Sequence, residues 1–471
     1  MNNPTLNRKI ASSINILESM IECRMAYENL PGMSVGLVYD QDLIWARGFG
    51  FRDVENEIEA TTDTIYRIAS ISKVFTSTAI MILRDRGKLN LHDPVKKFLS
   101  WFDIESSFED APPVTIFHLL THTSGIPREA PFPYWNDNIF PTREQMIEGL
   151  SRQKLCFPPG AQWKYSNLGM SIAGEVVEEV SEISYADFIE KEIFEPLGMI
   201  SSSVNIKEDQ KSRLATGYGR RMPDGTRNVM PFTESKGITP AANLSSTVED
   251  LSKFISLQFR DGKAGGNQIL KGRTLEEMQR VHWLQNNWQS GWGLGLSISR
   301  MNGHTICGHG GSVVGHRTEM RFCPEEKFGV IVLTNADGSN PDFYSERVFK
   351  HVMPTILNSE SEEKKLSAPP VEWERLTGRY RNSWGDTEVI LYNGGLAMIS
   401  PLSDNPWDEI IRLVPESDNI FTMQSPTGHG SIGEEVIFEC GTGGIPERIK
   451  VGDTYTMRIN DWNDKNNNLQ I

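Results

Sequence analysis

Residues 74–86, VFTSTAIMILRDR, are apolar nearly all round their first three turns, and this run constrains the fold more than any other part of the chain. A helix without a polar face needs apolar neighbours on every side, so we expect it to lie inside a large domain. Gly87 is expected to end it. At 471 residues the chain exceeds the size at which a single core stops growing, so we expect a large domain and a smaller one.

The segments around this run show both helical and strand periodicity. We expect a first helix before Pro31, a hairpin of residues 33–40 and 43–51, and two further helices between 168 and 195. A last helix is expected at about 342–357. Between the helices the pattern changes to short strands of an antiparallel meander: WGLGLSIS, HTICGHGG, HRTEMRFC and FGVIVLTN. The sequence therefore predicts an α+β fold, an antiparallel sheet flanked by helices with an inserted helical region.

Composition changes at residues 358–370, NSESEEKKLSAPP, which are charged, small and end in proline, as is typical of a solvated linker. We therefore expect a first domain at 1–357. Short strand-like runs at regular spacing follow over 371–460 and predict a small all-β barrel or sandwich: GRYRN, TEVILY, GLAMIS, EIIRLV, IFTMQS, EVIFEC, ERIKVG and TYTMRI. The asparagine-rich residues 461–471 are expected to form a flexible tail.

Charge narrows the classes of partner. With 62 acidic and 47 basic residues the formal charge is -15, which repels phosphate backbones and anionic lipid surfaces. No run approaches the roughly 20 apolar residues that span a bilayer. We expect no nucleic-acid or membrane partner, and a cytoplasmic protein without a signal peptide, with secretion as the alternative. Homo-oligomerisation is left open.

Cysteines and histidines give no metal or disulfide pattern. The five cysteines are scattered, odd in number and without CxxC spacing, so we expect free thiols. His118 and His122 lie four residues apart on a short predicted helix, but no third ligand follows at metal spacing, which favours helix packing or capping. We therefore expect no metal and no cofactor.

The first candidate for chemistry is Ser70-Ile71-Ser72-Lys73, at the start of the buried helix. Three residues along a helix are nearly one turn, which places the hydroxyl of Ser70 beside the ammonium of Lys73. Backbone N–H groups at a helix start would also stabilise an oxyanion. The alternative is a serine N-cap followed by a solvated lysine.

Two further motifs follow along the chain. In Tyr165-Ser166-Asn167, before a predicted helix, the phenol supplies an acid or base and the amide an orienting group; the alternative is simple packing of the aromatic ring. In His309-Gly310-Gly311-Ser312 two glycines weaken a predicted strand unless something, such as an acyl group, approaches its backbone closely. The alternative there is a β-bulge or a tight bend with a satisfied histidine beside it. Gly311–Gly315 also resembles a nucleophile elbow, but its last glycine is one place late.

In this order and spacing, Ser-x-x-Lys at 70–73, Tyr-x-Asn at 165–167 and His-x-Gly at 309–311 resemble the three motifs of serine β-lactamases and penicillin-binding proteins. The second and third differ from Ser-Asp-Asn and Lys-Thr-Gly, so the nearest resemblance is to class C β-lactamases and their esterase and D-aminopeptidase relatives. The resemblance covers about residues 15–357. The region after 371, which includes Leu-Thr-Gly-Arg-Tyr, looks like the lipocalin-like β-barrel appended to such hydrolases.

The resemblance implies that Ser70 attacks a carbonyl carbon and that Lys73 and Tyr165 move the proton. It implies that Asn167 orients Lys73 and the substrate. Backbone N–H groups of Ser70 and Ser312 would form the oxyanion hole.

At the third motif, Gly311 would line the substrate site and His309 would hydrogen-bond towards Tyr165. The family's lysine in Lys-Thr-Gly holds a substrate carboxylate, so its replacement by His309 argues against efficient β-lactamase activity. We therefore predict a serine hydrolase that cleaves a small ester, amide or short peptide, of the carboxylesterase or D-amino-acid peptidase type. A penicillin-binding sensor or a non-catalytic scaffold is the alternative.

Overall fold

The computed structural model describes residues 8–132, 134–261, 267–358, 369–425 and 431–463. The chain forms two compact units, residues 31–345 and residues 1–30 together with 346–471. The predicted domain boundaries stay a prediction. Most of the expected linker, residues 359–368, and the end of the expected tail, residues 464–471, lie outside the described residues.

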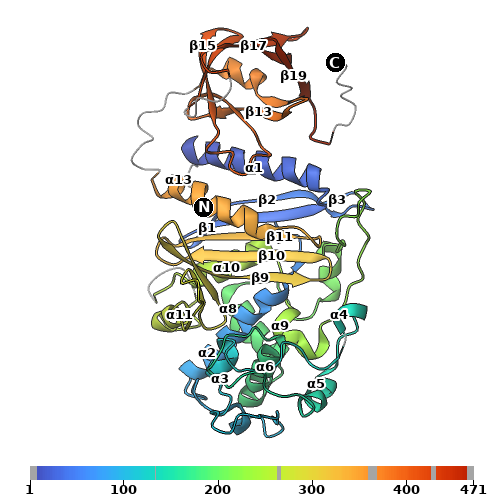
Figure 1. The fold of residues 1–471 in the computed structure, drawn as a ribbon, viewed down its shortest axis with the longest axis vertical. Helices are drawn as coiled ribbons and strands as arrows, with labels where there is room; N and C mark the ends of the chain where they lie inside the picture. Colours follow the sequence, from blue (N-terminus) through green and yellow to red (C-terminus); the bar gives the residue numbers. More distant parts are fainter. Residues whose placement is uncertain (1–7, 133, 262–266, 359–368, 426–430, 464–471) are drawn as a thin grey trace. The chain divides into compact units, whose positions relative to one another are not determined.

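A nine-stranded antiparallel sheet organises the larger unit (Figure 1). The predicted hairpin and meander are confirmed, and they meet where the first strand of the hairpin pairs with the last strand of the meander. The order is β3 (Ile58–Glu59), β2 (Asp42–Asp53), β1 (Gly32–Tyr39), β11 (Phe328–Thr334), β10 (His316–Cys323), β9 (His304–Val313), β8 (Ser297–Met301), β7 (Ser290–Trp292) and β6 (Trp283–Leu284). The last two strands were not predicted, because each is only two or three residues long.

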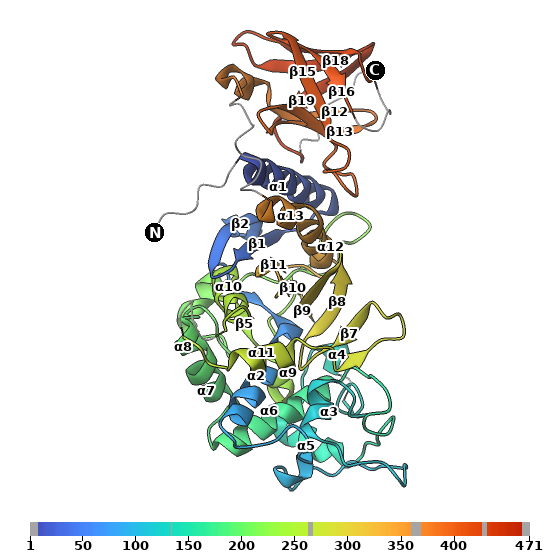
Figure 2. The ribbon, with the colours of Figure 1, turned by 90° about the vertical axis from the view of Figure 1, so that its left-hand side faces the viewer.

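The apolar run is helix α2 (Ser72–Asp85), and it is buried as predicted: every residue from Ser72 to Leu83 is buried. Gly87 follows its end in the left-handed region, with a φ of 72°. Helices gather around it (Figure 2). They are α6 (Asn167–Ser181), α7 (Tyr185–Ile189) and α9 (Thr239–Ala242), and α3 (Ile116–Leu120) packs on α6. These helices form the inserted helical region.

The other helices of the larger unit include α10 (Val248–Leu257), which packs on β1 and β11. The rest are the short helices α4 (Tyr134–Asp137), α5 (Arg143–Leu150), α8 (Glu195–Leu197) and α11 (Gly272–Met278). The last predicted helix corresponds to α12 (Pro341–Arg347), a π-helical turn (Val348–Val352) and α13 (Met353–Leu357).

The smaller unit contains a closed barrel of eight antiparallel strands. Each strand-like run predicted after residue 371 overlaps one of its strands, because alternating apolar residues between turn residues mark such strands clearly. They are β12 (Gly378–Asn382), β13 (Gly385–Tyr392), β14 (Gly395–Ile399), β15 (Ile411–Ser417), β16 (Ile420–Gln424), β17 (Glu435–Cys440), β18 (Pro446–Val451) and β19 (Thr454–Ile459). Side chains such as Tyr380, Phe421 and Phe438 pack together in a buried core.

The first helix, α1 (Arg8–Glu28), belongs to this smaller unit. Its Ile16 packs against Ile390 and Ile399, and its Cys23 packs against Trp462. The indole N–H of Trp407 donates a hydrogen bond to Ser13 Oγ at 3.0 Å. Residues from opposite ends of the chain therefore share one core.

No helix among the described residues is long and apolar enough to cross a membrane. The five cysteines are free, as expected, and Cys156 is exposed.

Candidate active site

Ser70 lies in a single 3-10 turn, Ala69–Ile71, that leads directly into α2. The residue before it, Ala69, has a φ of 50°, in the left-handed region that alanine avoids. Such a conformation costs on the order of 1–3 kcal/mol and persists only where the surroundings impose it. Ile71 stands at the N-cap of α2 and makes no side-chain capping bond. The N-cap interpretation of Ser70 is therefore wrong, and its hydroxyl is available for chemistry.

Lys73 is buried beneath this serine. Its Nζ lies 2.9 Å from Ser70 Oγ and donates a second hydrogen bond to the carbonyl of Ala241 at 2.8 Å. The side chain is 0% exposed, so the interpretation of Lys73 as a solvated lysine is also wrong. Burial, assisted by the positive charge of Arg128, lowers the pKa of Lys73 well below its ordinary value. A neutral amine beside the hydroxyl can accept its proton.

His122 holds the loop that carries Tyr165. Its carbonyl accepts the backbone N–H of Lys164 at 2.7 Å, and its Nδ1 accepts the backbone N–H of Ser166 at 3.2 Å. The Oγ of Ser166 in turn accepts the N–H of Gly169 at 2.8 Å and caps α6. Tyr165 therefore lies between two fixed backbone positions.

The phenol ring of Tyr165 is close to two basic side chains. Lys73 Nζ is 4.9 Å and Arg128 Cζ is 5.0 Å from its centroid. Burial nevertheless raises the pKa of Tyr165 above its ordinary value, and a hydrogen bond with Ser70 opposes this only in part. The phenol therefore stays protonated at neutral pH, which suits a proton donor better than a base.

Strand β9 carries the third motif past the nucleophile. Its pairing with β8 ends at Gly308, whereas its pairing with β10 continues to Val313 without a register shift. The β-bulge interpretation is therefore wrong. From His309 onwards the strand has no partner in β8, and Ser312 is exposed there.

Close packing explains why the third motif has a glycine at position 311. A Cβ on Gly311 would lie 2.3 Å from the carbonyl oxygen of Ile68 and 2.1 Å from Thr318 Oγ1. Only glycine lets β9 pass this close to the turn that holds Ser70. The strand and the nucleophile are thus held together by backbone contact.

His309 is buried and neutral. Burial, and then the charge of Lys73, lower its pKa to about 3. Its Nδ1 bonds the carbonyl of Gly310 at 2.5 Å, and its Nε2 has no partner. The ring centroid is 6.1 Å from that of Tyr165, so ring packing replaces the expected hydrogen bond.

Asn167 does not contact Lys73 by a hydrogen bond. Its Nδ2 donates to Glu129 Oε1 at 2.6 Å, while its Oδ1 has no partner. Glu129 is the carboxylate that acts on Lys73, and it opposes the fall in the pKa of the lysine. The sequence did not indicate Glu129, because nothing in the pattern around it separates it from a surface acid.

Two cavities lie at the two ends of the segment of β9 that runs from His309 to Ser312. The tryptophan cavity, about 570 Å³, precedes His309 and is lined by Trp163, Gln285, Asn286, Asn287, Ser290, Gly291, Trp292, Ser297, Ile298, Ser299, Ile306, Cys307, Gly308 and Arg321. The arginine cavity, about 370 Å³, follows Ser312 and is lined by Arg52, Asp53, Ile58, Arg67, Lys211, Ser212, Leu214, Ala215, Thr216, Gly217, Met230, Pro231, Phe232, Val314 and His316. The sequence did not indicate a role for Trp163 or Trp292, because a single aromatic residue carries no spacing signal.

One group of side chains in the larger unit has metal-ligand chemistry. Ligand atoms of His304, Cys323 and Glu325 lie within 4.8 Å of one another. Burial raises the pKa of Cys323 to about 11, so its thiol is protonated at neutral pH and is a poor ligand in this state. His118, by contrast, caps α3 through Thr115, as the capping interpretation expected.

Comparison with known proteins gives consistent results. The family model described as Beta-lactamase matches residues 17–351. Beta-lactamase-like protein 2 of Dictyostelium discoideum is 27% identical over all of this chain and 91% of its own length. Protein flp of Staphylococcus aureus (strain MRSA252) is 25% identical over 73% of this chain, which spans 66% of that protein.

Two solved structures share the fold. The octameric penicillin-binding protein homologue from Pyrococcus abyssi is 29% identical, with a TM-score of 0.65, 94% of this chain and 99% of that chain covered. A D-stereospecific amidohydrolase from Streptomyces sp. is 23% identical, with a TM-score of 0.59 and coverage of 72% and 97%. The second likeness shows the fold alone.

Proposed function

The chain belongs to the Beta-lactamase family of serine hydrolases, and from that premise we propose that it cleaves a small ester or amide through an acyl-enzyme on Ser70. The observation that carries the proposal is the pair formed by Ser70 Oγ and Lys73 Nζ, 2.9 Å apart with the lysine fully buried. A neutral lysine accepts the hydroxyl proton as Ser70 attacks the carbonyl carbon.

The leaving group receives its proton from the phenol of Tyr165. The raised pKa of Tyr165 keeps a proton on the phenol, and Lys73 restores it with the proton taken from Ser70. The backbone N–H groups of Ser70 and Ser312 hold the oxyanion. Water then attacks the acyl carbon as Lys73 takes its proton, and Lys73 passes that proton to Ser70 Oγ as the bond between Oγ and the acyl carbon breaks, which releases the acid and restores the hydroxyl.

His309 bears on the substrate class. With a pKa of about 3 it is neutral at pH 7, so it offers no positive charge to a carboxylate on the leaving group. Trp163 and Trp292 line the cavity next to Tyr165, with ring centroids 6.3 Å and 6.1 Å from the phenol. These contacts favour an uncharged aromatic or apolar leaving group over a β-lactam or a peptide ending in a free carboxylate. An esterase or D-aminopeptidase activity follows.

The test follows turnover and covalent mass together. The protein is mixed with p-nitrophenyl butyrate, D-alanine p-nitroanilide and a penicillin, and intact-mass spectrometry maps any adduct. Turnover of the ester or anilide with an adduct on Ser70 supports the proposal and identifies the activity. A lasting penicillin adduct without turnover would support the sensor, and no reaction would support the scaffold.

Ser70→Ala is expected to reduce turnover by at least about 10³-fold. Ser77→Ala is the matched control. Ser77 lies on the same helix, is fully buried, and its Oγ has no hydrogen-bond partner, so its removal should leave the rate within about twofold. Equal losses in the two variants would contradict the assignment of the nucleophile.

We also propose that the protein forms homo-oligomers, because the penicillin-binding protein homologue that matches 94% of this chain is described as octameric. Size-exclusion chromatography with light scattering gives the mass directly. A mass of 53.1 kDa, that of one chain, would contradict this proposal.

A further inference from the structure

The arginine cavity contains a buried cation without a carboxylate partner. Arg67 is 2% exposed, and among the described residues it forms no ion pair with a carboxylate. Its Nη2 donates to Ser235 Oγ at 3.1 Å and to Asn243 Oδ1 at 3.4 Å, its Cζ lies 5.1 Å from the centroid of the Phe232 ring, and its Nε has no hydrogen-bond partner. The exposed Glu234 is an acid whose charge acts on it from a greater distance. A buried charge without a carboxylate partner is costly, so a reason for keeping it is required.

Other groups around the cavity add to its positive character. Arg52 and Lys211 line it, and the single lining carboxylate, Asp53, accepts hydrogen bonds from the backbone N–H and the side-chain amide of Asn56. His316 is 3% exposed, and its pKa of about 4, lowered by burial, keeps it neutral at pH 7, so it offers the cavity a polar atom and no charge. Three basic side chains and one carboxylate therefore line this cavity, in a chain whose net charge is -15.

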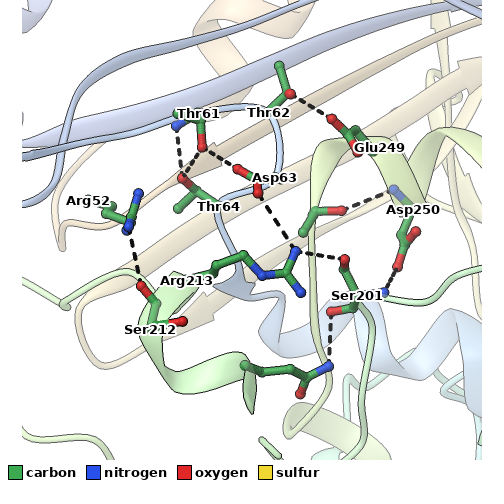
Figure 3. Close-up of polar contacts among 12 residues, drawn as sticks. Arg52, Thr61, Thr62, Asp63, Thr64, Ser201, Ser212, Arg213, Glu249 and Asp250 are labelled. Atoms are coloured by element: carbon green, nitrogen blue, oxygen red, sulfur yellow. Dashed lines mark hydrogen bonds and ion pairs between the residues drawn. The ribbon is translucent and has the colours of Figure 1, made fainter.

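The wall of the cavity is held rigidly. Figure 3 shows Arg213 between Asp63 and Ser201, with Nη1 2.9 Å from Ser201 Oγ. The same figure shows Arg52 donating to the carbonyl of Ser212, at 3.3 Å. These bonds hold the 211–217 segment on both sides. The cavity is thus part of the folded structure.

The cavity adjoins the nucleophile on the acyl side. Arg67 directly precedes Ile68, whose carbonyl contacts Gly311, and Val314 lies two residues after Ser312. The tryptophan cavity and Tyr165, which serves the leaving group, lie at the other end of this part of β9. A substrate whose carbonyl reaches Ser70 must therefore direct its acyl chain toward the arginine cavity.

We infer that the arginine cavity binds a carboxylate at the end of the substrate's acyl chain, through the guanidinium of Arg67. Guanidinium groups bind carboxylates in a paired, charge-assisted geometry. This inference rests on the proposed function and narrows its substrate to monoesters or monoamides of short dicarboxylic acids. Asn243, which contacts Arg67, serves as a positioning residue.

The test compares two p-nitrophenyl esters with five-carbon acyl chains: the monoglutaryl ester, with a terminal carboxylate, and the valeryl ester, without one. The wild-type protein should prefer the glutaryl ester in kcat/KM by about 10-fold or more, the value of one charged hydrogen bond. Arg67→Met should reduce that preference to within about twofold. Arg84→Met is the matched control, because Arg84 is a part-buried arginine that bonds Glu277 and does not line this cavity, and it should keep the preference.

A second pair of esters places the carboxylate on the leaving group: 4-carboxyphenyl butyrate against phenyl butyrate. A preference for the first that Arg67→Met removes would overturn the acyl-side assignment. Hydrolysis of valeryl and glutaryl esters at equal rates by the wild type would overturn the inference while leaving the proposed function standing. Absence of any Ser70-dependent hydrolysis would instead contradict the proposed function.

Binding without turnover gives an independent measurement. Glutarate should raise the Tm of Ser70→Ala, whereas neutral glutaramide should not, and the additional Arg67→Met change should abolish the effect. Arg67→Met is expected to fold, because it replaces an unpaired buried charge by an apolar chain of similar length. A Tm shift by glutarate that survives Arg67→Met would overturn the inference.

Discussion

The Nδ1 of His122 lies 3.2 Å from the backbone nitrogen of Ser166 and accepts its N–H, so a side chain on one loop fixes the backbone next to Tyr165. His122 is 1% exposed and has a φ of 56°. Burial lowers its pKa well below the ordinary value, which keeps Nδ1 free to accept a hydrogen bond at neutral pH. His122 is therefore a positioning residue for the phenol.

His122→Ala should reduce kcat by about 10-fold or more with little change in KM, because the phenol moves from the leaving group while the substrate cavities stay intact. His122→Asn should recover most of the activity, since its Oδ1 can accept the same N–H and asparagine tolerates positive φ. Steady-state kinetics on p-nitrophenyl butyrate measure both. Equal activity of the two variants would show that the acceptor atom does not matter.

The pH dependence of kcat/KM should follow Lys73. Its depressed pKa means that the fraction of neutral amine, and hence the rate, rises with pH and levels off well below the ordinary value of 10.5. The raised pKa of Tyr165, ordinarily 10.0, keeps the phenol protonated, so no fall in rate is expected up to about pH 9.5. Initial rates measured from about pH 5 to about pH 9.5 test both the rise of the rate with pH and the absence of a fall.

His309→Gln is the control for that profile. Because His309 has a pKa of about 3 it does not titrate in this range, so the rising limb should keep its position in the variant. Loss of the limb in His309→Gln would assign the titration to the histidine and contradict the role of Lys73 as the base.

Two adjacent glycines on β9 provide a matched pair. Gly311→Ala places a Cβ 2.3 Å from the backbone oxygen of Ile68, which cannot move without displacing the turn of Ser70. Gly310→Ala meets only the end of the Glu319 side chain, at 2.7 Å, which can rotate. We expect Gly311→Ala to reduce kcat/KM by at least about 10²-fold. We expect the reduction in Gly310→Ala to be about one tenth as large. A greater loss in Gly310→Ala would contradict the close approach at Ile68.

Local patterns predicted the barrel strands, the buried helix α2 and the meander, because each depends on residues near one another in sequence. The pattern could not show that α1 shares a core with β13 and β14, since Ile16 and Ile390 are far apart along the chain. The same limit applies to the site. The motifs indicated Ser70 and Lys73, whereas the role of His122 depends on a loop folded against it.

Arg67 illustrates a different limit. In sequence it is one basic residue in the strand-like stretch before the nucleophile, and arginines in such places usually reach solvent. Only the folded chain shows that the guanidinium is buried against Asn243 and Ser235, beside a cavity. Asn243 is far from Arg67 in the sequence, so its contact with the guanidinium also depends on the fold.

Acid should destabilise the protein through His316. Burial, and then the charge of Arg67, lower its pKa from 6.5 to about 4, so the unfolded chain binds this proton more tightly than the folded one. Its contribution is complete above pH 6.5 and is lost as pH falls toward 4. Between pH 7.5 and 4.5 the loss in free energy of unfolding amounts to about 2–3 kcal/mol.

His316→Gln isolates this contribution, because the amide has no charge to gain and every other titrating group is retained. Urea denaturation of both proteins at pH 7.5 and 4.5 gives the change in free energy of unfolding for each. The wild type should lose about 2–3 kcal/mol more than the variant over this range. Parallel losses would mean that the folded protein protonates His316 as readily as the unfolded chain does, which is incompatible with a ring buried beside Arg67.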